Sequence, residues 1–153
     1  RYSSKYFFNI LKSLDELSKY AQKNNVYLGI ENRFYYYEIP SLEEIGKILD
    51  NFKGSTIWYW HDTGHAQVQE NLGILKHLQF MELYKDHLLG IHLHDVKDTY
   101  DHLAPSKGEF DFRTISSYIK KETIKVIEAH QPATASDITE AKSYLEGIFD
   151  GRF

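Results

Sequence analysis

The chain of 153 residues is long enough for one domain with a sizeable core, and 42% hydrophobic with 26% charged residues is a globular composition. No apolar run reaches the roughly 18 residues of a membrane span, and a net charge of −4 gives no general electrostatic reason to bind nucleic acid. The absence of cysteine excludes disulfides, thiolate metal sites and cysteine nucleophiles, and it is compatible with the cytoplasmic location that we expect.

Helical and extended segments alternate along the first half of the chain. Residues 5–23 carry apolar side chains at helical spacing, which predicts an amphipathic helix. The apolar segment 26–30 is typical of a short buried strand, and Ser41 with Glu44 forms a capping-box pattern that opens the next helix. The segment 56–60 is rich in residues that favour a pleated surface and predicts a second strand.

The second half of the chain continues this alternation. We predict a long helix over about 70–85, strands over 88–94 and 124–127, and a last helix over about 137–148 that Asp137 opens. The only long stretch without a predicted element is about 95–112, and loops of that length in compact domains are usually functional or disordered. One helix followed by four strand–helix units predicts an α/β fold with a parallel sheet and right-handed crossovers.

An acidic or histidine side chain stands at the end of each predicted strand: Glu31, then His61 and Asp62, then His92 and His94, then Glu128. Steps of 31, 30 and 36 residues separate Glu31, Asp62, His92 and Glu128, which is about the length of one strand–helix unit. The carboxyl ends of parallel strands form one edge of a sheet, where the active sites of barrels of this kind lie. We therefore expect these four side chains to converge and to bind a divalent cation, Mn²⁺, Mg²⁺, Co²⁺ or Zn²⁺.

The alternative for each carboxylate is a helix cap or a solvated loop position. Glu31 and Glu128 argue against this alternative most strongly, because each directly follows an apolar strand, where an unpaired charge is costly. The recurrence of such residues once per unit favours a site.

A second group of candidates lies near the first. His65 follows Asp62 by three residues, and His102 lies in the long loop; each is either a surface histidine or a residue that binds substrate oxygens or a further metal. His130 follows Glu128 closely, but we expect it to point to the other side. We assign His77 and His87 to helical surface, and the tyrosines at 35–37 either wall a sugar pocket or form a partly buried loop cluster.

Five motifs follow one another over essentially the whole chain: Gly29-Ile30-Glu31-Asn32, His61-Asp62-Thr63-Gly64-His65, His92-Leu93-His94-Asp95, the loop His102-Leu103-Ala104-Pro105 with Gly108-Glu109-Phe110-Asp111-Phe112, and Val126-Ile127-Glu128. In this order and spacing they resemble the xylose isomerase-like TIM-barrel superfamily. That group holds sugar-phosphate isomerases and epimerases and the endonuclease IV type of AP endonuclease (AP endonuclease family 2). The resemblance implies that the four strands are the fifth to eighth of a (β/α)8 TIM barrel, and that residues 1–153 are one domain, its C-terminal half.

A complete barrel of this kind needs typically about 250 residues. The chain also opens on Arg1 rather than Met, so we expect a processed or truncated chain. A half-barrel exposes sheet edges and an apolar interior. We therefore expect it to pair with the missing N-terminal half-barrel or, as a homodimer, with a second copy of the chain.

The resemblance also implies residue roles. It assigns the metal ligands to Glu31, Asp62, His92 and Glu128, with Glu31 and Glu128 as the catalytic pair. His94 is a rival for the histidine ligand, and we favour His92 because the family's ligand usually stands three residues before an Asp, here Asp95. The candidates for binding substrate or a second metal are His65, His94, His102, Arg33 and Lys107.

These roles imply a metal-dependent isomerase or epimerase that acts on a small sugar, sugar phosphate or polyol derivative by proton transfer through an enediolate. The alternatives are a zinc-dependent phosphodiesterase that cleaves abasic DNA and a non-catalytic half-barrel fragment. The endonucleases place an Asp two residues before the loop histidine, where this chain has Tyr100. This departure disfavours DNA cleavage and nucleic acid as a partner, and we expect a small sugar-type substrate.

Overall fold

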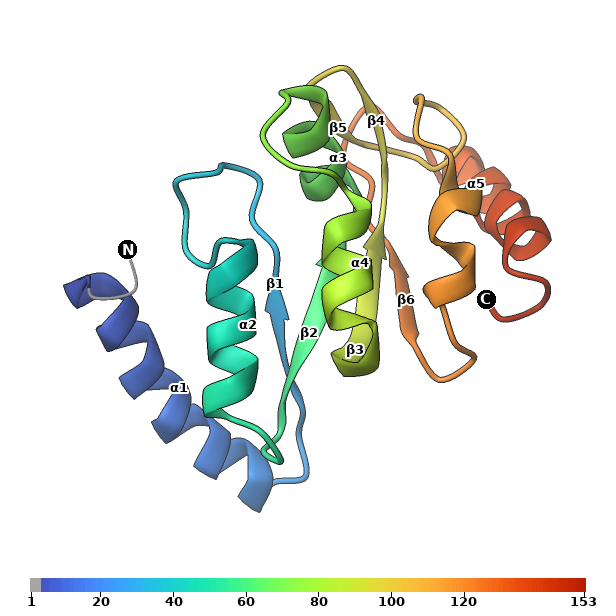
Figure 1. Cartoon of the computed structure of the whole chain (residues 1–153). Helices are drawn as coiled ribbons and strands as arrows, with labels where there is room; N and C mark the ends of the chain where they lie inside the picture. Colours follow the sequence, from blue (N-terminus) through green and yellow to red (C-terminus); the bar gives the residue numbers. More distant parts are fainter. Residues whose placement is uncertain (1–3) are drawn as a thin grey trace.

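A computed structural model describes residues 4–153 (Figure 1). The α-helices are α1 (Lys5–Lys23), α2 (Leu42–Asn51), α3 (Thr63–Asn71), α4 (Leu78–Tyr84) and α5 (Ala135–Ile148). The strands are β1 (Leu28–Glu31), β2 (Ile57–Asp62), β3 (Leu88–Leu93), β4 (Asp95–Lys97), β5 (Tyr100–Leu103) and β6 (Ile124–Ile127). Two 3-10 helices span Lys85–His87 and Phe112–Tyr118.

Four strands form a parallel sheet in the order β1-β2-β3-β6, as the alternating pattern predicts. The register pairs Asp62 with His92 and Leu93 with Ile127, so the candidate site residues reach the same edge of the sheet. Figure 1 shows α2 and α4 lying over the sheet, with α1 beyond β1 and α5 beyond β6. The short hairpin of β4 and β5 projects from the edge at which β3 ends.

Alternate residues of β2 have different neighbours. Ile57 and Tyr59 are buried against the helices, whereas Trp58 and Trp60 on the opposite side are half-buried. A Cβ atom at Gly90 would overlap the Trp60 ring, so the glycine in β3 makes room for the indole. The face that carries Trp60 also carries His92, since the two rings meet edge to face at 5.1 Å. The sheet is therefore covered by helices on one face and by its own large side chains on the other.

Three groups of buried apolar residues form the core on the helix side. The first joins β3 to the segment Phe110–Ile119 and to α5, the second joins β2 to α2 and α4, and the third joins α1 to α2 and β2. Within residues 4–153, no helix has the length and hydrophobicity that crossing a bilayer requires.

The predicted long helix over 70–85 is wrong. The helix begins at Thr63, directly after β2, because the Asp62 side chain accepts a hydrogen bond from the His65 N–H and caps it. It ends at Asn71, Gly73 takes a positive φ of 71°, and a separate helix starts at Leu78. The early start places His65 one turn from Asp62 rather than in a loop.

Two further boundaries differ from the sequence prediction. The stretch 95–112 is not without structure, because it contains the antiparallel hairpin β4–β5. The last helix starts at Ala135, two residues earlier than predicted, because Thr134 is its N-cap and Asp137 completes a capping box from the third position. The capping box that Ser41 and Glu44 predict is confirmed.

Candidate metal centre

Glu31, Asp62, His92 and Glu128 converge at the carboxyl edge of the sheet, where one ligand atom from each lies within 4.8 Å of all the others. His92 stands at the centre of the group. Its Nδ1 lies 2.6 Å from Glu31 Oε1, 2.9 Å from Glu128 Oε2 and 3.6 Å from Asp62 Oδ2. Three carboxylates around one imidazole form a group of hard oxygen donors and one nitrogen donor, which suits a divalent cation.

The two carboxylate oxygens of Asp62 differ in their hydrogen bonding. Oδ1 accepts hydrogen bonds from the His65 backbone N–H at 2.7 Å and from His94 Nε2 at 2.9 Å. Oδ2 is buried, has no hydrogen-bond partner among residues 4–153, and faces His92. Because a buried oxygen without a partner is costly, a cation at this point would supply what Asp62 lacks. The donor set therefore fits a metal.

The charges of this group are strongly coupled. Burial opposes ionisation of Asp62, but the neighbouring His92 and the hydrogen bond from His94 hold the pKa of Asp62 well below its usual range. Burial also opposes protonation of His92, but Asp62, Glu31 and Glu128 raise its pKa to about 10. In the metal-free chain the His92 proton therefore offsets part of the negative charge of the three carboxylates.

The Asn32 side chain links the end of β1 to the end of β2 by hydrogen bonds. Its side chain is fully buried, donates from Nδ2 to the Asp62 carbonyl at 2.9 Å and accepts from the Asp62 N–H at 2.7 Å. This reciprocal pair fixes the backbone of Asp62 relative to the end of β1. Sequence reasoning gave Asn32 no role, although a polar amide directly after a buried strand and a candidate ligand is a usable signal.

His94 lies behind Asp62 and not in the four-residue group. Its Nδ1 accepts from the His102 backbone N–H at 2.9 Å, so its proton is on Nε2, which donates to Asp62. A Cβ atom at Gly64 would overlap this ring, so the glycine in α3 lets the imidazole pack against the start of the helix. Both nitrogens are used, which places His92 rather than His94 among the four converging side chains.

The other candidate residues lie at different distances from the centre. His65 Nδ1 donates to the Asn32 carbonyl at 3.0 Å, and its ring lies edge to face with that of His102. Arg33 reaches Glu31 Oε2 at 3.5 Å, so it lies at the rim of the group. Lys107 instead pairs with Asp137 and Glu140, both on α5, at 3.3 and 2.8 Å, and the structure does not bring it into the centre.

Two expectations about histidines are wrong. His130 does not point away: β6 ends at Ile127, and the His130 backbone N–H bonds to the His102 carbonyl, which brings the two rings to a stacked contact at 3.9 Å. His77 is not on the helical surface but 2% exposed. Its Nε2 lies 2.9 Å from His61 Nε2 and its Nδ1 lies 3.1 Å from Gln67 Oε1, so it belongs to a buried hydrogen-bond chain.

Asp95 shapes the loop beyond the site. Its buried carboxylate accepts hydrogen bonds from the backbone N–H groups of Val96, Ser106, Gly108 and Phe110, all at 2.9–3.0 Å. Four donors on one carboxylate hold residues 106–110 against the end of β3. Asp95 is thus a structural residue of the loop.

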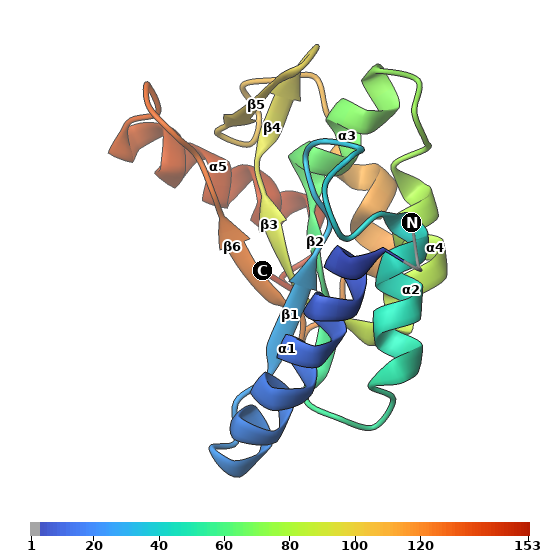
Figure 2. The same ribbon diagram turned by 90° about the vertical axis from the view of Figure 1, so that its left-hand side faces the viewer.

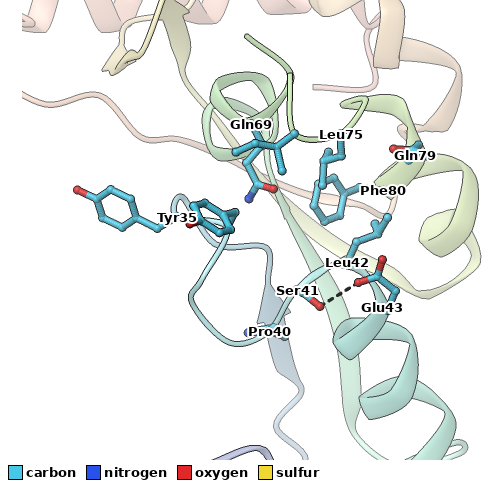
Figure 3. A pocket seen from close by; sticks show the side chains of 11 residues that line it. Tyr35, Pro40, Ser41, Leu42, Glu43, Gln69, Leu75, Gln79 and Phe80 are labelled. Carbon is cyan, nitrogen blue, oxygen red and sulfur yellow. Dashed lines mark hydrogen bonds between the residues drawn. The ribbon is translucent and has the colours of Figure 1, made fainter. Parts of the chain in front are cut away.

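A cavity of about 400 Å³ lies apart from the four converging residues, between the loop after β1 and the helices α2, α3 and α4 (Figure 3). Its lining residues include Tyr35, Tyr36, Leu42, Gln69 and Phe80, and none of the four converging residues. Phe34, in the loop after β1, lies edge to face with His65 at 5.9 Å and with Tyr35 of the cavity lining at 4.7 Å between ring centroids. Tyr35 and Tyr36 thus line a cavity, although all three tyrosines of the trio are largely exposed.

Comparison with known proteins identifies the family. Residues 2–148 match the family model of the xylose isomerase-like TIM barrel. The chain belongs to this family. No sequence among the curated proteins is significantly similar to the chain.

Solved structures agree with this family on the fold. A D-tagatose 3-epimerase-like protein superposes with a TM-score of 0.77 at 20% identity, over 94% of this chain and 54% of that one. The 3-keto-D-glucoside 4-epimerase of E. coli superposes with a TM-score of 0.71 at 15% identity, over 92% and 53%. The chain thus spans about half the length of these structures, as a half-barrel does.

Proposed function

We propose that this chain carries the metal-binding half of an isomerase or epimerase site for a small sugar, sugar phosphate or polyol derivative. The observation that carries the proposal is the convergence of Glu31, Asp62, His92 and Glu128, with Asp62 Oδ2 buried and lacking a partner. The similar structures, one of an epimerase and one of an epimerase-like protein, and membership of the xylose isomerase-like family support the reaction class.

A divalent cation held by these four residues would polarise a substrate carbonyl and its neighbouring hydroxyl, and so acidify the C–H bond next to the carbonyl. Glu31 is the last residue of β1 and Glu128 directly follows β6, the two outer strands of the sheet, and both side chains are partly exposed. One carboxylate takes the proton from the substrate carbon to give an enediolate, and the other returns a proton. Asn32 and His94 keep Asp62 fixed while this occurs.

Solvent exchange tests the proton transfer. The protein is incubated with Mn²⁺ and a panel of ketohexoses in D₂O, and deuterium at the carbon next to the carbonyl is followed by NMR. We expect exchange with at least one sugar, and a fall of about 100-fold or more in Glu31→Gln and in Glu128→Gln, since general acid–base catalysis contributes that much. Exchange at an unchanged rate in both variants would contradict the proposal.

The phosphodiesterase alternative gains no support from the geometry. A third metal site at the position used by the endonucleases would need a ligand at 100, where the chain has Tyr100, which is exposed. His94 cannot substitute, because both of its ring nitrogens are engaged. We therefore do not propose DNA cleavage.

A further inference from the structure

Two groups of side chains next to the metal centre offer a possible second set of ligands. The first is His65, His94 and His102, and the second is His102, Glu128 and His130; in each, the three ligand atoms lie within 4.8 Å of one another. Hydrogen-bond accounting separates the two groups, because an imidazole whose two ring nitrogens both hydrogen-bond to groups outside the ligand set has no lone pair left for a cation.

The first group is not a complete set. His94 Nδ1 accepts from the His102 backbone, and His94 Nε2 donates to Asp62, so neither nitrogen has a free lone pair. That leaves His65 and His102 alone, and two ligands do not make a tightly binding site.

The second group has free ligand atoms. Asp101 Oδ2 lies 3.0 Å from His102 Nδ1, and no hydrogen bond to His102 Nε2 occurs among residues 4–153. A carboxylate that holds one nitrogen of an imidazole while the other binds metal is the usual arrangement of histidine ligands. No hydrogen bond to the His130 ring occurs among residues 4–153; the side chain is exposed, its ring stacks on that of His102, and its ligand atom lies within 4.8 Å of those of His102 and Glu128.

Glu128 connects this group to the first centre. Its Oε2 lies 2.9 Å from His92, whereas its Oε1 faces His102 Nε2 at 3.8 Å, too far for a hydrogen bond and suitable for two ligands of one cation. His102 is held here at a cost, because it adopts a positive φ of 56°, which residues other than glycine rarely do. Such backbone strain persists where the surrounding structure enforces it, often at functional sites.

We propose that His102, Glu128 and His130 bind a second divalent cation, with Glu128 bridging it to the first. Two imidazoles and one carboxylate favour a cation of the zinc type, such as Zn²⁺ or Co²⁺, over Mg²⁺. Asp101 acts as a positioning residue for His102. The site goes beyond the proposed function, since it requires His130, which the proton transfer does not use.

A Zn²⁺ titration of the full chain, followed by calorimetry, tests the second site. We expect two ions per chain in the wild type, one in His130→Ala, one in Glu31→Gln, and two in His87→Ala, a control at an exposed histidine far from the site. In Asp101→Asn we expect two ions, with the second bound about 10–100-fold more weakly. Circular dichroism confirms that each variant is folded.

Three other outcomes of this titration decide between the second site and the proposed function. A single ion that His130→Ala retains and Glu31→Gln loses would overturn the second site and leave the proposed function intact. A single ion that His130→Ala loses and Glu31→Gln retains would support the second site and deprive the proposed function of its cation. No bound Zn²⁺ in the wild type would overturn both.

Discussion

At the scale of single residues, the orientation of Asp62 decides whether a metal centre exists. His94 and the His65 N–H occupy Oδ1 and leave Oδ2 free. We expect His94→Phe, which keeps the ring but removes the donor, to weaken Mn²⁺ binding about 10–100-fold, as the loss of a partner behind a ligand typically does. Mn²⁺ titration measures this, with His87→Phe as the matched control. Equal affinity in the wild type and His94→Phe would show that His94 does not position Asp62.

His77 makes the stability of the protein depend on pH. Burial lowers the pKa of His77 to about 4, although Glu70 acts in the opposite direction. The unfolded chain takes up a proton near pH 6.5, so the stabilising effect is complete above that pH and is lost as the pH falls toward 4. The loss amounts to about 3 kcal/mol of unfolding free energy.

Urea denaturation between pH 7 and pH 4.5 measures this dependence. In His77→Gln, which retains a polar side chain opposite His61, we expect a smaller loss of stability over the same range. Identical pH profiles for wild type and variant would mean that His77 is not the group responsible.

Some of the residue positions could be predicted from the sequence, and others could not. The four converging residues could be predicted because they recur once per strand–helix unit at the same point. The burial of His77 and the inward position of His130 could not, because each depends on contacts with residues distant in sequence, His61 and His102. The same holds for Asn32, whose role appears only when β1 and β2 lie side by side.

At the scale of elements, side-chain caps determine where helices start. Ser41 Oγ accepts from the Glu44 N–H at 3.3 Å, and Glu44 accepts from the Ser41 N–H at 2.8 Å. We expect Ser41→Ala to lower the unfolding free energy by about 1 kcal/mol. Mn²⁺ affinity is expected to stay unchanged, because α2 contributes no metal ligand. Thermal and urea denaturation measure the first effect; an unaltered stability would show that this cap does not support α2.

Element boundaries were the least predictable part of the fold. The strand at 124–127 was predicted as observed, because it is short, apolar and flanked by polar residues. The start of α3 was missed, because the sequence Asp62-Thr63-Gly64-His65 was interpreted as ligands and not as an N-cap followed by a first helical turn. One carboxylate does both, since Asp62 Oδ1 caps the helix while Oδ2 remains free.

At the scale of the whole molecule, β1 and β6 are the edge strands of the parallel sheet, and within residues 4–153 neither has a partner on its outer side (Figure 2). Figure 1 shows α1 beyond β1 and α5 beyond β6, so this chain already supplies a helix at each edge. A second copy closing an eight-stranded barrel would bring an α1 and an α5 to each junction, where a barrel has one helix. We therefore propose that the sheet is completed to a barrel by four strands joined by three helices, as an N-terminal half-barrel would provide, in preference to a homodimer.

The isolated chain is expected to associate through the exposed edge strand β6. Ile124 and Val126 of β6 are 49% and 38% exposed, and an apolar edge strand pairs readily with other chains. Val126→Lys should reduce association, whereas Leu83→Lys, at an exposed leucine of α4, should not. Sedimentation velocity measures the species; a wild-type chain that is entirely an 18.0 kDa monomer would contradict the expectation.

The central claim is that Glu31, Asp62, His92 and Glu128 bind one divalent cation, and Mn²⁺ titration followed by electron paramagnetic resonance tests it most directly. The signal of free Mn²⁺ is expected to fall on addition of the wild-type chain and to persist with Asp62→Asn, while Asp86→Asn, at an exposed aspartate, behaves as the wild type. Equal Mn²⁺ binding by the wild type and by Asp62→Asn would contradict the claim.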